Sequence, residues 1–203
     1  MKSRFAALVV LGTLCSAGIA AAQDTAPTPG FVEVTYMPVG AAYVPAKGNS
    51  PSFGNYGFGT AVTFNVNRYL GVEGELSTMI ATTSDLQFGD LNSQVKAPNM
   101  LSYTGSVLVT PVTFNRFIPY GAVGLGGVSM FARPALGVTD DQTFLAGNFG
   151  GGLKWYAPNN RWGLRGDYRM GVVKSKDDAP GFFGAETRYM HRVYGAVVIN
   201  TVK

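Results

Sequence analysis

The stretch Gly150–Val173, GGGLKWYAPNNRWGLRGDYRMGVV, decides the fold. From Trp162 onward every second residue is large and apolar, apart from Gly166, and the residues between them are glycines and charged side chains. This alternation predicts a β-strand with one apolar and one polar face. In a soluble barrel the apolar face would be inside, whereas in a membrane barrel it would meet lipid and the charges would occupy the lumen.

Two features of the stretch favour the membrane barrel. Glycines such as Gly163 and Gly171 share the polar face with the charges, as a crowded lumen would prefer. Aromatic residues gather beside the turn instead, where a membrane barrel carries a girdle at the lipid–water interface. The expected interface aromatics are Tyr69, Trp155, Tyr156 and Trp162.

Residues 1–22 have the pattern of an export signal. A basic start precedes the uncharged apolar run Phe5–Ile19, and three alanines at 20–22 supply the small residues that a signal peptidase needs. We expect cleavage after residue 22, a flexible leader at 23–29 and one barrel domain at 30–203. The single cysteine, Cys15, lies in the signal, so the mature chain is expected to have no disulfide, thiolate metal site or cysteine nucleophile.

The composition favours strands and gives no basis for a nucleic-acid partner. Glycine is abundant, with 27 residues, and charged residues make up only 14%, against about 25% in a typical globular domain. Removing Lys2 and Arg4 from the 16 basic residues leaves 14 against 12 acidic residues, a mature charge of +2. A binder of nucleic acid would be far more basic, with its positive charge clustered.

The strand pattern predicts an all-β fold: an eight-stranded antiparallel up-and-down transmembrane β-barrel. Strands are expected at 30–44, 55–65, 70–81, 100–110, 117–131, 144–156, 161–174 and 188–200. Short connections alternate with long ones, and the long ones are 45–54, 82–99, 132–143 and 175–187. Because membrane barrels keep short turns in the periplasm and long loops outside, we expect both termini in the periplasm.

The third strand repeats the two-faced design. In Asn67–Met79, NRYLGVEGELSTM, one face is apolar and the other carries Glu73 and Glu75. If the eight strands close in chain order, the acids on this strand lie roughly opposite the bases on the seventh strand. Buried charges are very costly unless they are paired. The expected lumenal network consists of Glu33, Glu73, Glu75, Lys154, Arg165, Asp167 and Arg169. In it the two acids of the third strand pair with Arg165, Arg169 and Lys154. Ordinary solvent-facing charges of a soluble barrel are the alternative.

Three segments resemble the small OmpA-like and OmpX-like family of outer-membrane β-barrels: Asn67–Leu76, Pro119–Gly127 and Gly151–Arg169. The resemblance runs over nearly the whole mature chain. It implies a place in the outer membrane among lipid and lipopolysaccharide, with insertion by the barrel assembly machinery. Larger members carry a second, peptidoglycan-binding domain, which we do not expect in this chain. Members often end on an aromatic residue, whereas this chain ends VVINTVK, Val197–Lys203.

We expect a non-enzymatic, monomeric barrel with a structural or adhesion-like role. Its lumen would be filled by side chains, because an eight-stranded barrel is just wide enough for them. An extracellular ligand or a host or cell surface would be contacted through loops 82–99, 132–143 and 175–187. A narrow porin-like channel for small solutes is the main alternative, and a soluble lipocalin-like carrier is another.

The sequence predicts no catalytic, cofactor or metal site. An enzyme acting on membrane lipid needs a base near a nucleophile, and the only histidine, His191, has Val193 rather than Ser or Thr at i+2. The acidic loop pairs Asp85 with Asp90 and Asp177 with Asp178 lack the spacing of a calcium loop.

Overall fold

The computed structural model describes residues 31–47, 52–88, 91–132, 140–174 and 187–201. The expected signal peptide and leader, Asp90 and the 177–178 pair therefore lie outside the described residues. Within the described ranges, no helix has the length and apolar character of a membrane span.

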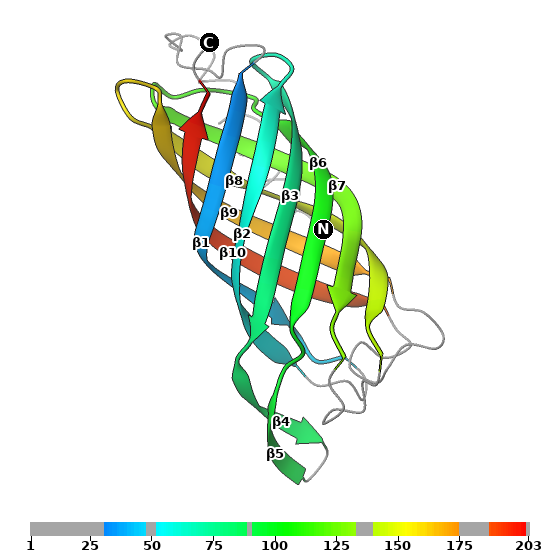
Figure 1. Ribbon diagram of the computed structural model, residues 1–203. Coiled ribbons are helices and arrows are strands. Elements are labelled where there is room, and N and C mark those ends of the chain that lie inside the picture. The colour runs from blue at the N-terminus through cyan, green and yellow to red at the C-terminus, as the bar shows by residue number, and fades with distance from the viewer. Residues whose placement is uncertain (1–30, 48–51, 89–90, 133–139, 175–186, 202–203) are drawn as a thin grey trace, which may run out of the picture.

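Eight antiparallel strands close into a barrel (Figure 1), which confirms the predicted fold. They are β1 (Val32–Val44), β2 (Phe53–Asn65), β3 (Leu70–Ala81), β6 (Met100–Val109), β7 (Phe117–Met130), β8 (Gln142–Tyr156), β9 (Trp162–Val173) and β10 (Arg188–Asn200). Around the barrel the order is β1-β10-β9-β8-β7-β6-β3-β2. β3 and β9 thus lie on opposite sides, as expected from closure in chain order.

The expected long connection at 82–99 contains two further strands that the sequence analysis missed. β4 (Thr83–Phe88) and β5 (Leu91–Lys96) pair antiparallel from Thr83 opposite Lys96 to Phe88 opposite Leu91. Figure 1 shows this hairpin projecting beyond one end of the barrel. Gly-Asp at 89–90 is a typical two-residue hairpin sequence, and polar and apolar residues alternate before it only over the short run Asp85–Phe88.

The short connections gather at the other end of the barrel, together with the start of β1 and the end of β10 (Figure 1). Asn115 and Asn160 have positive φ values of 54° and 52°, a conformation that asparagine tolerates better than most residues. In the β2–β3 turn, the side-chain oxygen of Asn67 accepts hydrogen bonds from the backbone N–H groups of Tyr69 and Leu70, at 2.7 and 2.9 Å. These turn residues therefore explain how the short connections at this end of the barrel are formed.

The two faces of each strand have the predicted orientation. On β9, Leu164 is 50% exposed while its neighbour Arg165 is 3% exposed. The exposed large apolar residues include Val34, Phe58, Val62, Val72, Leu76, Val107, Val123, Leu125, Leu145, Phe149, Leu153, Val193 and Ile199. Soluble monomers rarely expose apolar surface on this scale, so the outer face is suited to lipid.

Candidate functional site

Every charged residue of the eight barrel strands lies on the inner face and is at most 5% exposed. The acids are Glu33, Glu73, Glu75 and Asp167, and the bases are Lys154, Arg165, Arg169, Arg188 and Arg192. The structure thus places all seven residues of the expected network in the interior, and Arg188 and Arg192 join them.

At the centre, Glu73 of β3 meets the charges of β9 across the barrel. Arg165 donates to both carboxylate oxygens of Glu73, with Nη1–Oε2 at 2.5 Å and Nη2–Oε1 at 3.1 Å. Arg169 Nη2 lies 2.8 Å from Glu73 Oε1, and its Nε lies 2.8 Å from Asp167 Oδ1. The Thr63 hydroxyl also donates to Glu73, at 2.9 Å. Two acids and two arginines therefore neutralise one another in a place that water reaches poorly.

Tyr120 of β7 completes this central cluster, although the sequence analysis did not select it. Its hydroxyl donates to Asp167 Oδ2 and accepts a 2.6 Å hydrogen bond from Arg165 Nε. The Arg165 guanidinium lies 4.9 Å from the centre of the Tyr120 ring, and Lys154 Nζ lies 5.4 Å from it. The ring thus lies near two cationic groups while its hydroxyl bonds to Asp167 and Arg165.

Nearer the short turns, Lys154 of β8 forms an ion pair with Glu33 of β1. The other Glu33 oxygen, Oε1, accepts a hydrogen bond from Asn65 Nδ2 at 2.8 Å. Lys154 therefore joins the interior through Glu33 rather than through an acid of β3.

Glu75 has a different partner from the one predicted. Its Oε1 lies 2.9 Å from Arg192 Nη1 on β10 and also accepts hydrogen bonds from the hydroxyls of Tyr194 and Ser77, at 3.0 and 3.1 Å. The predicted pairing of Glu75 with Arg165 and Arg169 is wrong. Successive inward positions on a strand rise along the barrel axis, so Glu73 and Glu75 reach different levels and meet different strands.

The sequence analysis missed Arg192 because β10 mixes polarities on both faces. The inner positions include Arg188, Met190 and Arg192, while the outer ones include His191. One signal in the sequence could have found it. Val193 and Ile199 are an even number of positions apart and therefore share one face of the strand, which assigns Arg192 to the other face.

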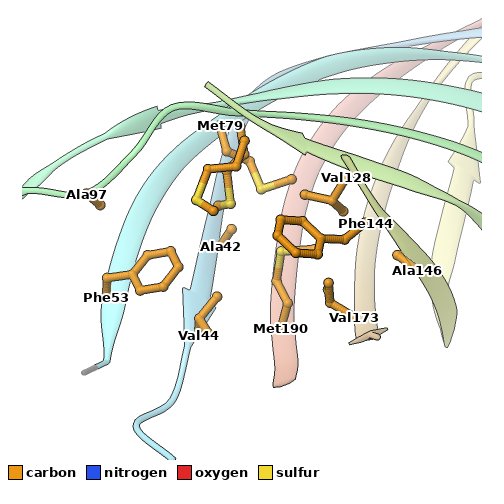
Figure 2. Packing of buried hydrophobic residues seen from close by; sticks show 12 residues of the cluster. Ala42, Val44, Phe53, Met79, Ala97, Val128, Phe144, Ala146, Val173 and Met190 are labelled. Atoms are coloured by element: carbon orange, nitrogen blue, oxygen red, sulfur yellow. The ribbon is translucent and has the colours of Figure 1, made fainter. Parts of the chain in front are cut away.

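Apolar clusters flank the charges at both ends of the interior. At the end of the long connections, buried side chains from all eight barrel strands and Ala97 form one cluster (Figure 2): Ala42, Val44, Phe53, Met79, Ala97, Met100, Val128, Met130, Phe144, Ala146, Val173 and Met190. At the short-turn end, Ile118, Tyr156 and Val198 form a smaller one. Most of the buried charges thus lie between the two clusters, while Arg188 pairs in register with Val173 of the larger cluster.

The expected interface aromatics divide between the two faces. Tyr69 and Trp162 are exposed at 46% and 43%, and Trp155 is half-buried, with its ring 5.7 Å from that of Trp162 in an edge-to-face contact. Tyr156 is only 3% exposed, so its assignment to the interface is wrong. It follows Lys154 by two residues, and period-two alternation turns both inward.

Further exposed aromatics occur near both ends of the barrel. Phe64, Phe114 and Phe117 are 48–50% exposed near the short turns. Near the long connections, Tyr43, Tyr56, Phe131 and Tyr189 are 40–49% exposed. The sequence analysis named none of these residues.

The sequence model of the outer membrane protein beta-barrel domain matches residues 6–189. The chain belongs to this family. Its members are barrels of the outer membrane, which agrees with the apolar outer face and indicates the same location for this protein.

Solved structures of outer-membrane barrels are similar in fold. Neisserial surface protein A matches with a TM-score of 0.58 and 13% identity, over 84% of this chain and 96% of that one. OprG of Pseudomonas aeruginosa matches with 0.51 and 14%, over 88% and 99%. The attachment invasion locus protein Ail of Yersinia pestis, in complex with the heparin analogue sucrose octasulfate, matches with 0.50 and 13%, over 86% and 100%. No curated protein matches the sequence.

His191 of this outer-membrane barrel lies on the outer face. Its Nδ1 is 2.7 Å from the hydroxyl oxygen of Tyr168, and the two rings stack with centroids 6.2 Å apart. In the described part of the chain, no group of three or more His, Cys, Asp or Glu residues is arranged to hold a metal ion.

Proposed function

We propose that this protein is a non-enzymatic outer-membrane barrel with a closed lumen, which acts in envelope structure or in surface contacts through its long connections. The observation that carries the proposal is the filled interior: paired charges occupy its middle, and apolar side chains occupy both ends.

The closed lumen follows from size and from pairing. An eight-stranded barrel has room for little besides its own side chains. Ions that crossed this one would pass the Met- and Phe-containing cluster at one end, whose apolar side chains cannot replace their hydration shell. They would then meet carboxylates that already bind arginines. Both features oppose passage.

Surface contacts fit the shape of the long-connection end. The β4–β5 hairpin extends beyond the barrel (Figure 1) and carries its paired backbone away from the membrane-facing strands. We place this end outside the cell, both termini in the periplasm, and Tyr69, Trp155 and Trp162 at the periplasmic interface. Outer-membrane lipid and lipopolysaccharide, the assembly machinery and an extracellular ligand are the partners of this proposal, with the barrel itself a monomer.

Planar-bilayer recording tests the closed lumen. We expect the purified, refolded wild-type barrel to show no steady single-channel current in salt solution. Faster migration of the unboiled than of the boiled protein on an SDS gel serves as the control for folding. A steady current from the folded wild type would contradict the proposal.

A narrow pore is the second candidate, and buried polar atoms favour it. Thr104 Oγ1, Asn148 Nδ2 and Arg192 Nε are among the buried atoms that make no hydrogen bond with the described protein, and a hydrated path would provide partners for them. In a pore, Arg165→Ala would widen the path and raise the current at little cost in stability. In a closed barrel it lowers stability and leaves the current absent.

Surface labelling tests the orientation. An epitope tag inserted at Asn92, in the hairpin, should bind antibody on intact cells, whereas the same tag at Asn159, in a short turn, should bind only after the outer membrane is opened. Labelling of the Asn159 tag on intact cells would reverse the orientation.

A further inference from the structure

Four methionines meet inside the barrel at the end of the long connections. Met79, Met100, Met130 and Met190 are each at most 2% exposed and belong to one apolar cluster. Figure 2 shows Met79, Phe144 and Met190 pointing into the same space. Met100 begins β6 and Met130 ends β7, so on these two strands the cluster lies directly beside the long connections.

Three of these methionines stand in a row across neighbouring strands. Met79 of β3 pairs with Met100 of β6, and Met100 pairs in turn with Met130 of β7. Side chains that face each other across antiparallel strands have Cβ atoms about 4.5–5.5 Å apart. Three flexible thioether side chains that start this close together can bring their sulfur atoms to a single point.

Burial alone does not explain the choice of methionine. Among the non-aromatic side chains of this cluster, all those larger than valine are methionines. At the opposite end, the interior uses Leu108 and Ile118, and the outer face uses leucine and isoleucine at many positions, such as Leu76 and Ile199. Four of the six methionines in the described residues therefore gather at one interior level of the barrel.

The chemistry of this level selects a particular kind of ion. Thioether sulfur is a soft ligand that prefers copper(I) and its analogues over hard cations. The cluster contains no carboxylate to bind a divalent ion, and the neighbouring Arg188 and Arg192 on β10 oppose a high charge. Since Arg192 is already paired with Glu75, a single positive charge meets much less opposition.

We propose that Met79, Met100, Met130 and Met190 form a thioether site for a soft monovalent cation, copper(I) or silver(I). Binding forms metal–sulfur bonds without any change of oxidation state. It requires no other ligand from the chain and does not depend on whether the lumen conducts.

Silver(I) is the probe, because it needs no reductant. The folded barrel should retain about one silver ion per chain after equilibrium dialysis, since one cluster supplies the ligands. In protein labelled with ¹³C at the methionine methyl groups, the four methyl signals of the cluster should shift. Met100→Leu keeps the apolar volume and should weaken silver binding by at least about tenfold, and the triple change at 79, 100 and 130 should abolish it.

Three matched variants control for other silver ligands. Met170→Leu changes a half-buried outer-face methionine, Met37→Leu changes an interior methionine of another cluster, and His191→Gln removes the histidine. All three should bind silver like the wild type. Absence of retained silver in the folded wild type, or equal binding by the folded triple Met→Leu variant, would show that the methionines only fill space.

Discussion

The barrel interior has two levels that are buried to the same degree but held together by different forces. In the middle, Arg165 and Glu73 are 3% and 1% exposed, and each carries a charge that needs its own partner. At the end of the long connections, Phe144 and Met100 are fully buried in apolar contacts that any side chain of similar volume can make. Equal burial therefore does not mean equal tolerance to substitution.

The two levels differ in tolerance because a substitution leaves a different defect in each. An ion pair that loses one member leaves a charge in a place of low dielectric constant, and the cost depends on that orphaned charge. An apolar contact that loses a few atoms leaves a gap, and the cost grows with the size of the gap. The predictions below test this contrast, from the largest expected effect to the smallest.

Arg165→Ala should lower the free energy of unfolding by about 3–5 kcal/mol, because it leaves Glu73 and Asp167 without one of their two arginines. Urea unfolding in lipid vesicles measures this. Removing Glu73 as well should recover part of the loss, since the main orphaned acid is then gone. Strictly additive losses would mean that the two side chains do not interact.

Leu164→Arg places a charge on the opposite face of the same strand, beside Arg165. It should cost about 2–4 kcal/mol if the residue lies near the middle of the membrane. Leu164→Ala is the control and should cost much less, because it exposes no charge to lipid. Equal stability of Leu164→Arg and wild type in vesicles would overturn the assignment of the faces.

Glu75 and Arg192 should show a coupling free energy of about 0.5–3 kcal/mol in a double-mutant cycle, as expected for residues in contact. The cycle uses Glu75→Gln, Arg192→Met and the double variant, each measured by urea unfolding. Coupling of Glu75 to Arg165 larger than its coupling to Arg192 would contradict the pairing in the structure.

Met100→Leu should change the free energy of unfolding by less than about 1.5 kcal/mol, because volume-conserving apolar substitutions are tolerated in cores. The comparison with Arg165→Ala is the test: the two positions are both buried on the inner surface, but the loss of unfolding free energy should be severalfold larger at Arg165. A loss at Met100 as large as that at Arg165 would show that the apolar cluster is as specific as the ion pairs.

The sequence by itself determined the number of barrel strands, their bounds to within two residues and, on the third and seventh strands, the face that points outward. These features depend on local periodicity, because side chains alternate along a strand whatever its neighbours are. The same rule would have assigned Tyr156 to the interior, two residues after Lys154. The hairpin of β4 and β5 left its turn dipeptide and the short alternating run Asp85–Phe88 as signals, which the sequence analysis did not use.

Only the tertiary structure decided which interior residues meet. Glu73 pairs with β9 and Glu75 with β10, although the two acids are two residues apart on one strand. The row of Met79, Met100 and Met130 joins residues from three strands. Strand register, tilt and closure set these contacts together, and no stretch of sequence contains that information, because partners across a barrel are fixed by the whole ring of strands.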